Sequence, residues 1–116
     1  MKTSIRVNPK KGRGVFAEES INKDSIIEVC ELILVDIKDV QGILEGYVYA
    51  YNKHKVALAL GNGSLYNHSD KANALFQIDH RKKVIKIKAK KDIKPGEEIT
   101  INYGYSLNDR NKFKIQ

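Results

Sequence analysis

The chain has 116 residues, a formal charge of +7 and 41% hydrophobic residues. It is long enough for one domain with a modest core, and too short to hold a second catalytic domain. No stretch approaches the roughly 18 apolar residues of a membrane-spanning helix, and the N-terminus, charged from Lys2, lacks the apolar run of a signal peptide. We therefore expect a single globular domain over residues 1–116, without a membrane partner and located inside the cell, in the cytoplasm or a host nucleus.

The single cysteine limits the chemistry of the chain. Cys30 excludes an internal disulfide and a cysteine-rich zinc cluster within these residues. It lies in an apolar run without a basic neighbour, so we predict a packed strand residue rather than a nucleophile. His54 and His80 each occur singly, which predicts no metal site.

The first third of the chain reads as short strands. We predict strands at residues 3–7 and 14–17, joined by a turn at residues 8–12 that contains Pro9 and Gly12. A longer β-rich run follows at residues 26–35.

From Asp36 the hydrophobic period changes to that of a helix, with Asp36 or Asp39 as the candidate N-cap. Gly42 and Gly46 would each weaken this helix by roughly 1 kcal/mol relative to alanine. We predict one short helix here, on the apolar positions Val40, Ile43, Leu44, Tyr47, Val48 and Tyr51.

The second half of the chain again favours strands. A hairpin is predicted around His80 and Arg81, and a last strand follows the turn at Pro95 and Gly96. The expected strands cover residues 56–60, 74–79, 82–89 and 98–103. The chain is therefore predicted to be mainly β.

Much of the excess positive charge lies between residues 81 and 94. This basic ribbon consists of Arg81, Lys82, Lys83, Lys86, Lys88, Lys90, Lys91 and Lys94. Lysines alternate with apolar residues over 86–90, which is typical of a half-buried strand with a solvated face. The other interpretation is a footprint for an anionic partner.

Three motifs occur in a fixed order: Gly12-Arg13-Gly14-Val15-Phe16-Ala17, then Tyr66-Asn67-His68-Ser69, then Gly96-Glu97-Glu98-Ile99-Thr100-Ile101-Asn102-Tyr103-Gly104. Together they closely resemble the SET-domain protein lysine methyltransferases. The resemblance implies a mainly β, SET-type β-clip fold with one short helix. It also implies a knot-like threading of the C-terminal strand that brings Asn67 and Tyr103 together.

The resemblance implies that S-adenosylmethionine is bound by Gly12, Arg13, Gly14, Asn67, His68 and Tyr103. Glycines let backbone approach a ligand because no Cβ intervenes. The Asn67 amide offers both a donor and an acceptor. His68 is expected to contribute mainly backbone contacts, and Tyr103 to act as the catalytic residue beside the transferred methyl.

By position, Tyr47 and Tyr105 resemble residues that line the family's substrate-lysine channel. An apolar, aromatic channel disfavours an ammonium ion, so it would lower the acceptor lysine's pKa from about 10.4 and produce the reactive neutral amine. Tyr49, Tyr51 and Tyr66 are predicted to pack instead. Glu97 and Glu98 are predicted to form a polar turn that enters a strand.

Many eukaryotic members carry cysteine-rich zinc segments that this chain lacks, and the compact viral and bacterial members are more similar to it. The predicted activity is methylation of a lysine in a protein, either a histone or another basic protein, with S-adenosylmethionine as co-substrate and no metal. A homodimer is expected by analogy with a minimal viral member.

The alternative is a non-catalytic binding module that docks on nucleic acid or an acidic protein through the basic ribbon. That ribbon lacks the interleaved aromatic residues of a single-strand stacking platform, which counts against nucleic acid.

Overall fold

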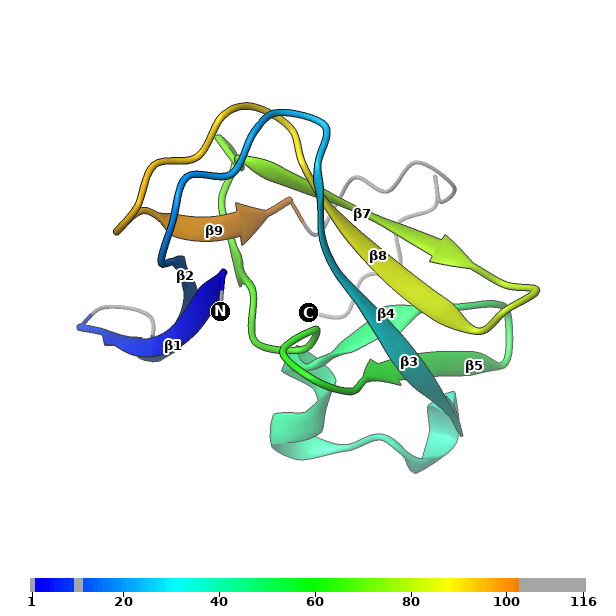
Figure 1. The fold of residues 1–116 in the computed structure, drawn as a ribbon. Coiled ribbons are helices and arrows are strands. Elements are labelled where there is room, and N and C mark those ends of the chain that lie inside the picture. Colours follow the sequence, from blue (N-terminus) through cyan, green and yellow to red (C-terminus); the bar gives the residue numbers. More distant parts are fainter. Residues whose placement is uncertain (1, 10–11, 103–116) are drawn as a thin grey trace.

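Two β-sheets make up most of the fold, as the computed structural model shows for the residues it describes, 2–9 and 12–102 (Figure 1). One sheet has four strands in the order β1-β2-β9-β6, and the other has five in the order β4-β5-β3-β8-β7. The strands are β1 Thr3–Asn8, β2 Gly12–Ala17, β3 Ile26–Asp36, β4 Val48–Ala50, β5 Lys55–Ala59, β6 Asn67–His68, β7 Ala74–Asp79, β8 Val84–Ala89 and β9 Glu98–Ile101. The mainly β prediction is confirmed.

The four-stranded sheet joins three distant parts of the sequence. β1 and β2 form an antiparallel hairpin, and β2 then pairs with β9 through Val15 and Ile99. β6 pairs with β9 in parallel, with Asn67 opposite Thr100. The predicted last strand is confirmed to Ile101, and the two-residue strand β6 was not predicted.

The five-stranded sheet is antiparallel throughout and is built around the long strand β3. The predicted hairpin is present as β7 and β8. Ile85, Ile87 and Ala89 are fully buried, whereas Lys86 and Lys88 are half-buried on the other face. This alternation confirms the half-buried strand interpretation for this part of the basic ribbon.

The main core combines apolar residues of both sheets. Val15, Ile99 and Ile101 of the smaller sheet belong to the same buried cluster as Ile85 and Ile87 of the larger one. Beyond the strands, the loops before β3 and before β9 run side by side (Figure 1). The backbones of Ile21 and Ile93 exchange two hydrogen bonds there, of 2.9 and 2.8 Å, which satisfies buried polar groups outside the sheets.

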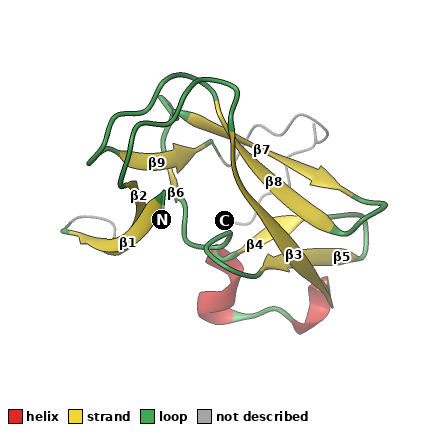
Figure 2. Cartoon of the chain, viewed as in Figure 1, coloured by secondary structure: helices red, strands yellow, loops and turns green. Residues whose placement is uncertain are grey.

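The predicted helix after Asp36 is wrong. The segment instead forms two short 3-10 helices, η1 Ile37–Asp39 and η2 Gly42–Gly46, and then strand β4 (Figure 2). Gly42 has φ +64°, outside the right-handed helical region. Asp36 does not cap a helix; its carboxylate accepts a 2.6 Å bond from Lys55 Nζ. The helical period failed because Tyr49 belongs to a strand and is buried in the core.

The threading expected for the C-terminal segment lies partly on residues 103–116, which are outside the described part of the chain.

Candidate functional site

The site begins at the glycine motif on β2. Gly12 has φ +84°, a conformation that favours glycine, and nothing lies within 4 Å of the place where its Cβ would be. Gly14 is buried and has no such room. A Cβ there would overlap Glu98 Oε2 and lie 2.8 Å from Asn67 Nδ2. The two glycines therefore serve different purposes: Gly12 allows an exposed turn, and Gly14 admits two polar side chains.

Asn67 lies against the glycine motif. Its Nδ2 donates to the backbone carbonyl of Arg13 at 3.0 Å and to Glu98 Oε2 at 2.7 Å. A carbonyl and a carboxylate can only accept hydrogen bonds, so the NH2 group of the Asn67 amide must face them. The structure thus brings together Arg13, Gly14 and Asn67, three of the residues that the resemblance implies bind the cofactor.

A second asparagine, Asn73, holds the backbone of β9, the strand that carries Glu98. Asn73 Nδ2 donates to the Glu98 carbonyl at 2.9 Å, and Asn73 Oδ1 accepts from the Thr100 amide at 2.9 Å. Because both bonds go to the backbone of β9, they fix this strand where it faces Asn67. Neither Asn73 nor Glu98 was predicted to take part in the site.

Sequence reasoning missed Glu98 because a carboxylate beside Pro95 and Gly96 is typical of a solvated turn. The available signal was the alternation of Glu98 and Thr100 with two isoleucines. That pattern puts Glu98 on the same face of the predicted strand as Thr100, which is only 9% exposed.

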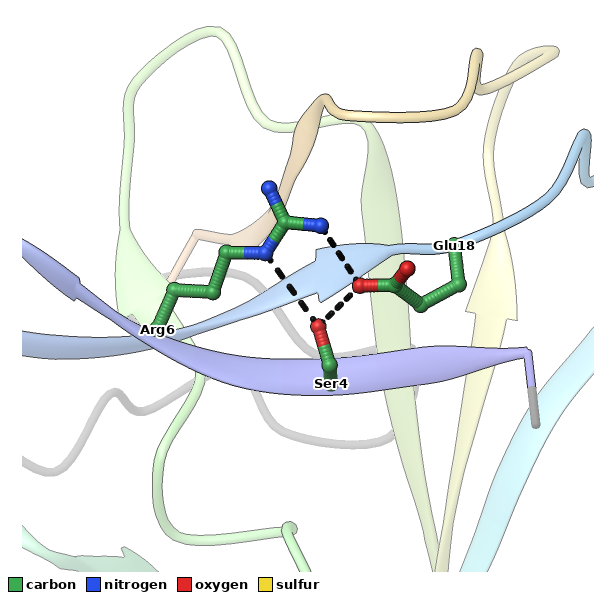
Figure 3. Close-up of polar contacts among 3 residues, drawn as sticks. All are labelled: Ser4, Arg6 and Glu18. Carbon is green, nitrogen blue, oxygen red and sulfur yellow. Dashed lines mark hydrogen bonds and ion pairs between the residues drawn. The ribbon is translucent and has the colours of Figure 1, made fainter.

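The outer strand of the hairpin is held by a polar cluster formed by Ser4, Arg6 and Glu18 (Figure 3). The Ser4 hydroxyl donates to Glu18, and Arg6 Nη2 donates to the same carboxylate at 2.6 Å. Those two bonds lower the pKa of Glu18 below its ordinary value. Arg6 also lies over the Phe16 ring, with 5.6 Å between the guanidinium carbon and the ring centroid. These contacts tie β1 to the strand that carries the glycines.

His68 follows Asn67 on β6 and is exposed. Its Nε2 lies 3.1 Å from Asp70 Oδ1, an ion pair only when the imidazole is protonated. The backbone of the next residue is fixed, because the Ser69 amide donates to the Ile101 carbonyl at 2.9 Å. The backbone contact to the cofactor that the resemblance implies for His68 stays a prediction.

The loop that leads into Asn67 is fixed by a carboxylate from β3. Glu28 accepts from the Tyr66 hydroxyl at 2.6 Å and from the Asn62 amide at 3.0 Å. Tyr66 is 1% exposed, which confirms its predicted place in the core. Burial, together with the Glu28 carboxylate, raises the pKa of Tyr66, so the phenol stays a donor.

Cys30 lies close to this loop. It is buried on β3, and burial, with the negative charge of Glu28, raises the pKa of its thiol to about 12. A Cβ at Gly63 would lie 3.0 Å from its sulfur. The predicted packed cysteine is confirmed, and the neutral thiol is a poor nucleophile.

The predicted channel and catalytic tyrosines are not all within the described residues. Tyr103 and Tyr105 lie outside them. Tyr47 is half-buried at the C-terminal end of η2 and directly before β4, which belongs to the larger sheet, whereas the glycines and Asn67 lie on the smaller one.

Two of the remaining tyrosines pack as predicted. The Tyr49 hydroxyl donates to the Gly63 carbonyl at 2.7 Å, and its ring meets Phe76 edge-on. Tyr51 contacts His80, with ring centroids 4.4 Å apart.

Within residues 2–9 and 12–102, no group of three or more His, Cys, Asp or Glu side chains is arranged to hold a metal ion. No helix in the same residues is long and apolar enough to cross a membrane.

Comparisons with known proteins agree with this arrangement. Residues 12–104 match the SET domain family. A fission yeast (Schizosaccharomyces pombe) protein named histone-lysine N-methyltransferase, H3 lysine-37 specific, is 34% identical over 108 residues, which span 89% of this chain and 74% of the relative.

Two solved structures have a similar fold. The crystal structure of a candidate histone methyltransferase from Plasmodium falciparum superposes with a TM-score of 0.76 at 35% identity, over 91% of this chain and 100% of that one. KRYPTONITE, solved with mCHG DNA and SAH, gives a TM-score of 0.71 over 97% of this chain and 25% of that one. At 24% identity, the second likeness shows the fold alone.

The family match includes the glycine strand, the Asn67 loop and β9, which are the segments that the structure brings together. The chain belongs to the SET-domain family and is a protein-lysine methyltransferase.

Proposed function

We propose that this chain, as a single SET domain over residues 1–116, transfers a methyl group from S-adenosylmethionine to a lysine side chain of a histone or another basic protein. The observation that carries the proposal is the contact of the Asn67 amide with the carbonyl of Arg13 and with Glu98. This contact supports the proposal because it joins the Asn67 side chain to β2, the strand that begins at Gly12 and carries Arg13 and Gly14.

The residues at this location fit an amino-acid-bearing nucleoside. The Gly12 backbone is open to a ligand, because nothing lies within 4 Å of its missing Cβ. The cofactor site is proposed to comprise Gly12, Arg13, Gly14, Asn67, His68 and Tyr103. When bound, S-adenosylmethionine supplies an activated methyl group on a sulfonium.

The remaining chemistry is proposed to come from tyrosines. Tyr47 and Tyr105 would wall the lysine channel, where removal of water favours the neutral amine over the ammonium ion. The Tyr103 hydroxyl would orient that amine. Holding the reacting atoms in line can contribute roughly 7 to 11 kcal/mol to lowering the barrier. No metal is required for this role.

A histone is the favoured substrate class because the fission yeast relative is named for histone H3. The enzyme is proposed to act inside the cell and to form a homodimer, a second subunit completing the channel. Nucleic acid is not a proposed partner, since the basic ribbon has no interleaved aromatic residues.

Asn67→Ala and Tyr103→Phe test the assignment when assayed side by side. Incubation with labelled S-adenosylmethionine and a panel of histones and other basic proteins, without added metal, measures transfer, and calorimetry with S-adenosylhomocysteine measures binding. Asn67→Ala is expected to lose both. Tyr103→Phe is expected to lose transfer and keep binding, because an interaction made only in the transition state affects turnover alone.

Absence of binding by the unaltered chain at millimolar ligand would overturn the proposal. Near-normal turnover in Tyr103→Phe would instead remove Tyr103 as the catalytic residue and leave Tyr105 and Tyr47 to be tested. Sedimentation of an active preparation as a monomer at micromolar concentration would exclude the homodimer.

A further inference from the structure

Glu98 has no role in the proposed chemistry, yet its side chain lies where it can control Asn67. It is half-buried on β9, and its Oε2 accepts from Asn67 Nδ2 at 2.7 Å. Gly14 lies against the same two groups without room for a Cβ. A glycine, an amide and a carboxylate from three separate segments are therefore fitted to one another.

We propose that Glu98 is a positioning residue that fixes the Asn67 amide with its oxygen, Oδ1, as the only side-chain group left for a ligand. This inference rests on the proposed function, because the ligand is the amino-acid portion of S-adenosylmethionine or S-adenosylhomocysteine. It goes further by giving Glu98, a residue outside the proposed cofactor site, the role of orienting the Asn67 amide toward the ammonium group of that ligand.

The hydrogen-bond inventory of Asn67 supports this orientation. A side-chain amide has two N–H donors, and both are used, one by the Arg13 carbonyl at 3.0 Å and one by the Glu98 carboxylate. A flipped amide would place Oδ1 against two oxygen acceptors, with no proton between any of these three oxygens. Oδ1 can only accept, so its ligand partner must be a donor.

Charge reinforces the same selection. Donation to a carboxylate polarises an amide, and hydrogen bonds in a chain strengthen one another in a partly buried setting. The Asn67 oxygen therefore becomes a stronger acceptor for a cation and a poorer neighbour for an anion. Of the two charged groups of an amino acid, the ammonium fits Oδ1 and the carboxylate does not.

Glu98 is itself held in place. Its carbonyl accepts from Asn73 Nδ2, and two residues later the Thr100 amide donates to Asn73 Oδ1, both at 2.9 Å. Because the backbone of β9 is fixed at these two points, the carboxylate does not have to be positioned by the ligand. The acceptor is thus organised before binding, which reduces the ordering cost.

The test compares two ligands by calorimetry: S-adenosylhomocysteine and its analogue that lacks the α-amino group. The unaltered chain is expected to prefer the first by about tenfold or more, as for a hydrogen bond to a charged group. Glu98→Ala is expected to lose most of that preference, with little change in the affinity for the analogue. Glu98→Gln keeps an acceptor and should retain an intermediate preference.

Glu97→Gln is the matched control, because it removes a neighbouring negative charge without touching Asn67. Its ligand preference should equal that of the unaltered chain. In nitrogen-15 spectra, the Asn67 side-chain amide signal should shift in Glu98→Ala and not in Glu97→Gln, which reports the amide without any ligand.

Each other outcome is decisive. If Glu98→Ala weakens both ligands equally, or neither, Glu98 does not orient Asn67 and the inference fails while the proposed function stands. If the unaltered chain binds neither ligand, the proposed function fails and this inference fails with it. Should Glu98→Ala not fold, the unaltered chain still decides, since equal affinity for the two ligands would refute selection of an ammonium.

Discussion

Replacing Tyr66 by phenylalanine is expected to destabilise the fold more than removing any other tyrosine hydroxyl of the described residues. The change keeps the buried ring and deletes only the oxygen that donates to Glu28 at 2.6 Å. Glu28 then keeps the Asn62 amide at 3.0 Å as its remaining partner in this pair of bonds. The loop that delivers Asn67 loses one of the two bonds that it makes to the Glu28 carboxylate.

The size of the loss follows from the charge of the acceptor. A hydrogen bond to a charged group contributes roughly 1.5 to 3 kcal/mol. Glu28 is half-buried, so water can partly replace the phenol, and the lower part of that range applies. We expect a loss of about 1.5 to 2 kcal/mol in the free energy of unfolding, or about 6 to 8 °C in Tm for a domain of this size.

Tyr49→Phe is the matched control. Its hydroxyl donates to a neutral acceptor, the Gly63 carbonyl, at 2.7 Å, and the residue is also buried. The expected loss is about 1 kcal/mol. Urea and thermal unfolding of both variants at neutral pH measure the difference. A loss in Tyr66→Phe no larger than that in Tyr49→Phe would refute the charge-assisted bond.

Three further predictions concern pH and charge. Burial raises the pKa of the Cys30 thiol from 9.0 to about 12, so the free energy of unfolding should decrease as pH rises through that interval. In Cys30→Ala, unfolding measured at alkaline pH should show a smaller decrease. The pKa of Glu18 is lowered, so its ionised carboxylate stabilises the fold above the ordinary pKa of 4.5, and this stabilisation is lost as pH falls below that value. Glu18→Gln should therefore make the free energy of unfolding fall less steeply with decreasing pH, as measured by circular dichroism. Replacing Lys86, Lys88 and Lys90 together by glutamine should leave the affinity for S-adenosylhomocysteine nearly unchanged in calorimetry, whereas a large loss would place the basic ribbon in the ligand site.

The strands could be predicted because their signals are local. The alternation of apolar and polar residues, together with the turn residues, located β7, β8 and β9 to within a few residues. Both signals depend only on residues that are close in the sequence. The helix failed for the opposite reason. The apolar residues near Tyr49 fit a helical period, but pairing with β5 determines their structure, and that partner is several residues further along.

The site was predictable only where residue type itself carries the chemistry. Glycines and an Asn-His pair are conspicuous in a sequence, and Gly14 and Asn67 do lie against each other in the structure. Glu98 was not recognised because its importance depends on a parallel pairing between β6 and β9, 31 residues apart at the Asn67–Glu98 contact. Parallel strands are not joined by a short turn, so no local sequence pattern indicates which residues they bring into contact.

This topology also explains why the site can be both rigid and open. β9 lies between β2 and β6, so a single strand fixes the glycine motif on one side and Asn67 on the other. Both neighbours are held by backbone pairing, which needs no particular side chains, and the side chains at the junction are therefore available for recognition. Of these, Glu98 has turned inward to Asn67. The open backbone at Gly12 and the oriented oxygen of Asn67 are then the groups that we propose meet the ligand, and this division of roles depends on glycine at position 14 and on a carboxylate or its amide at position 98.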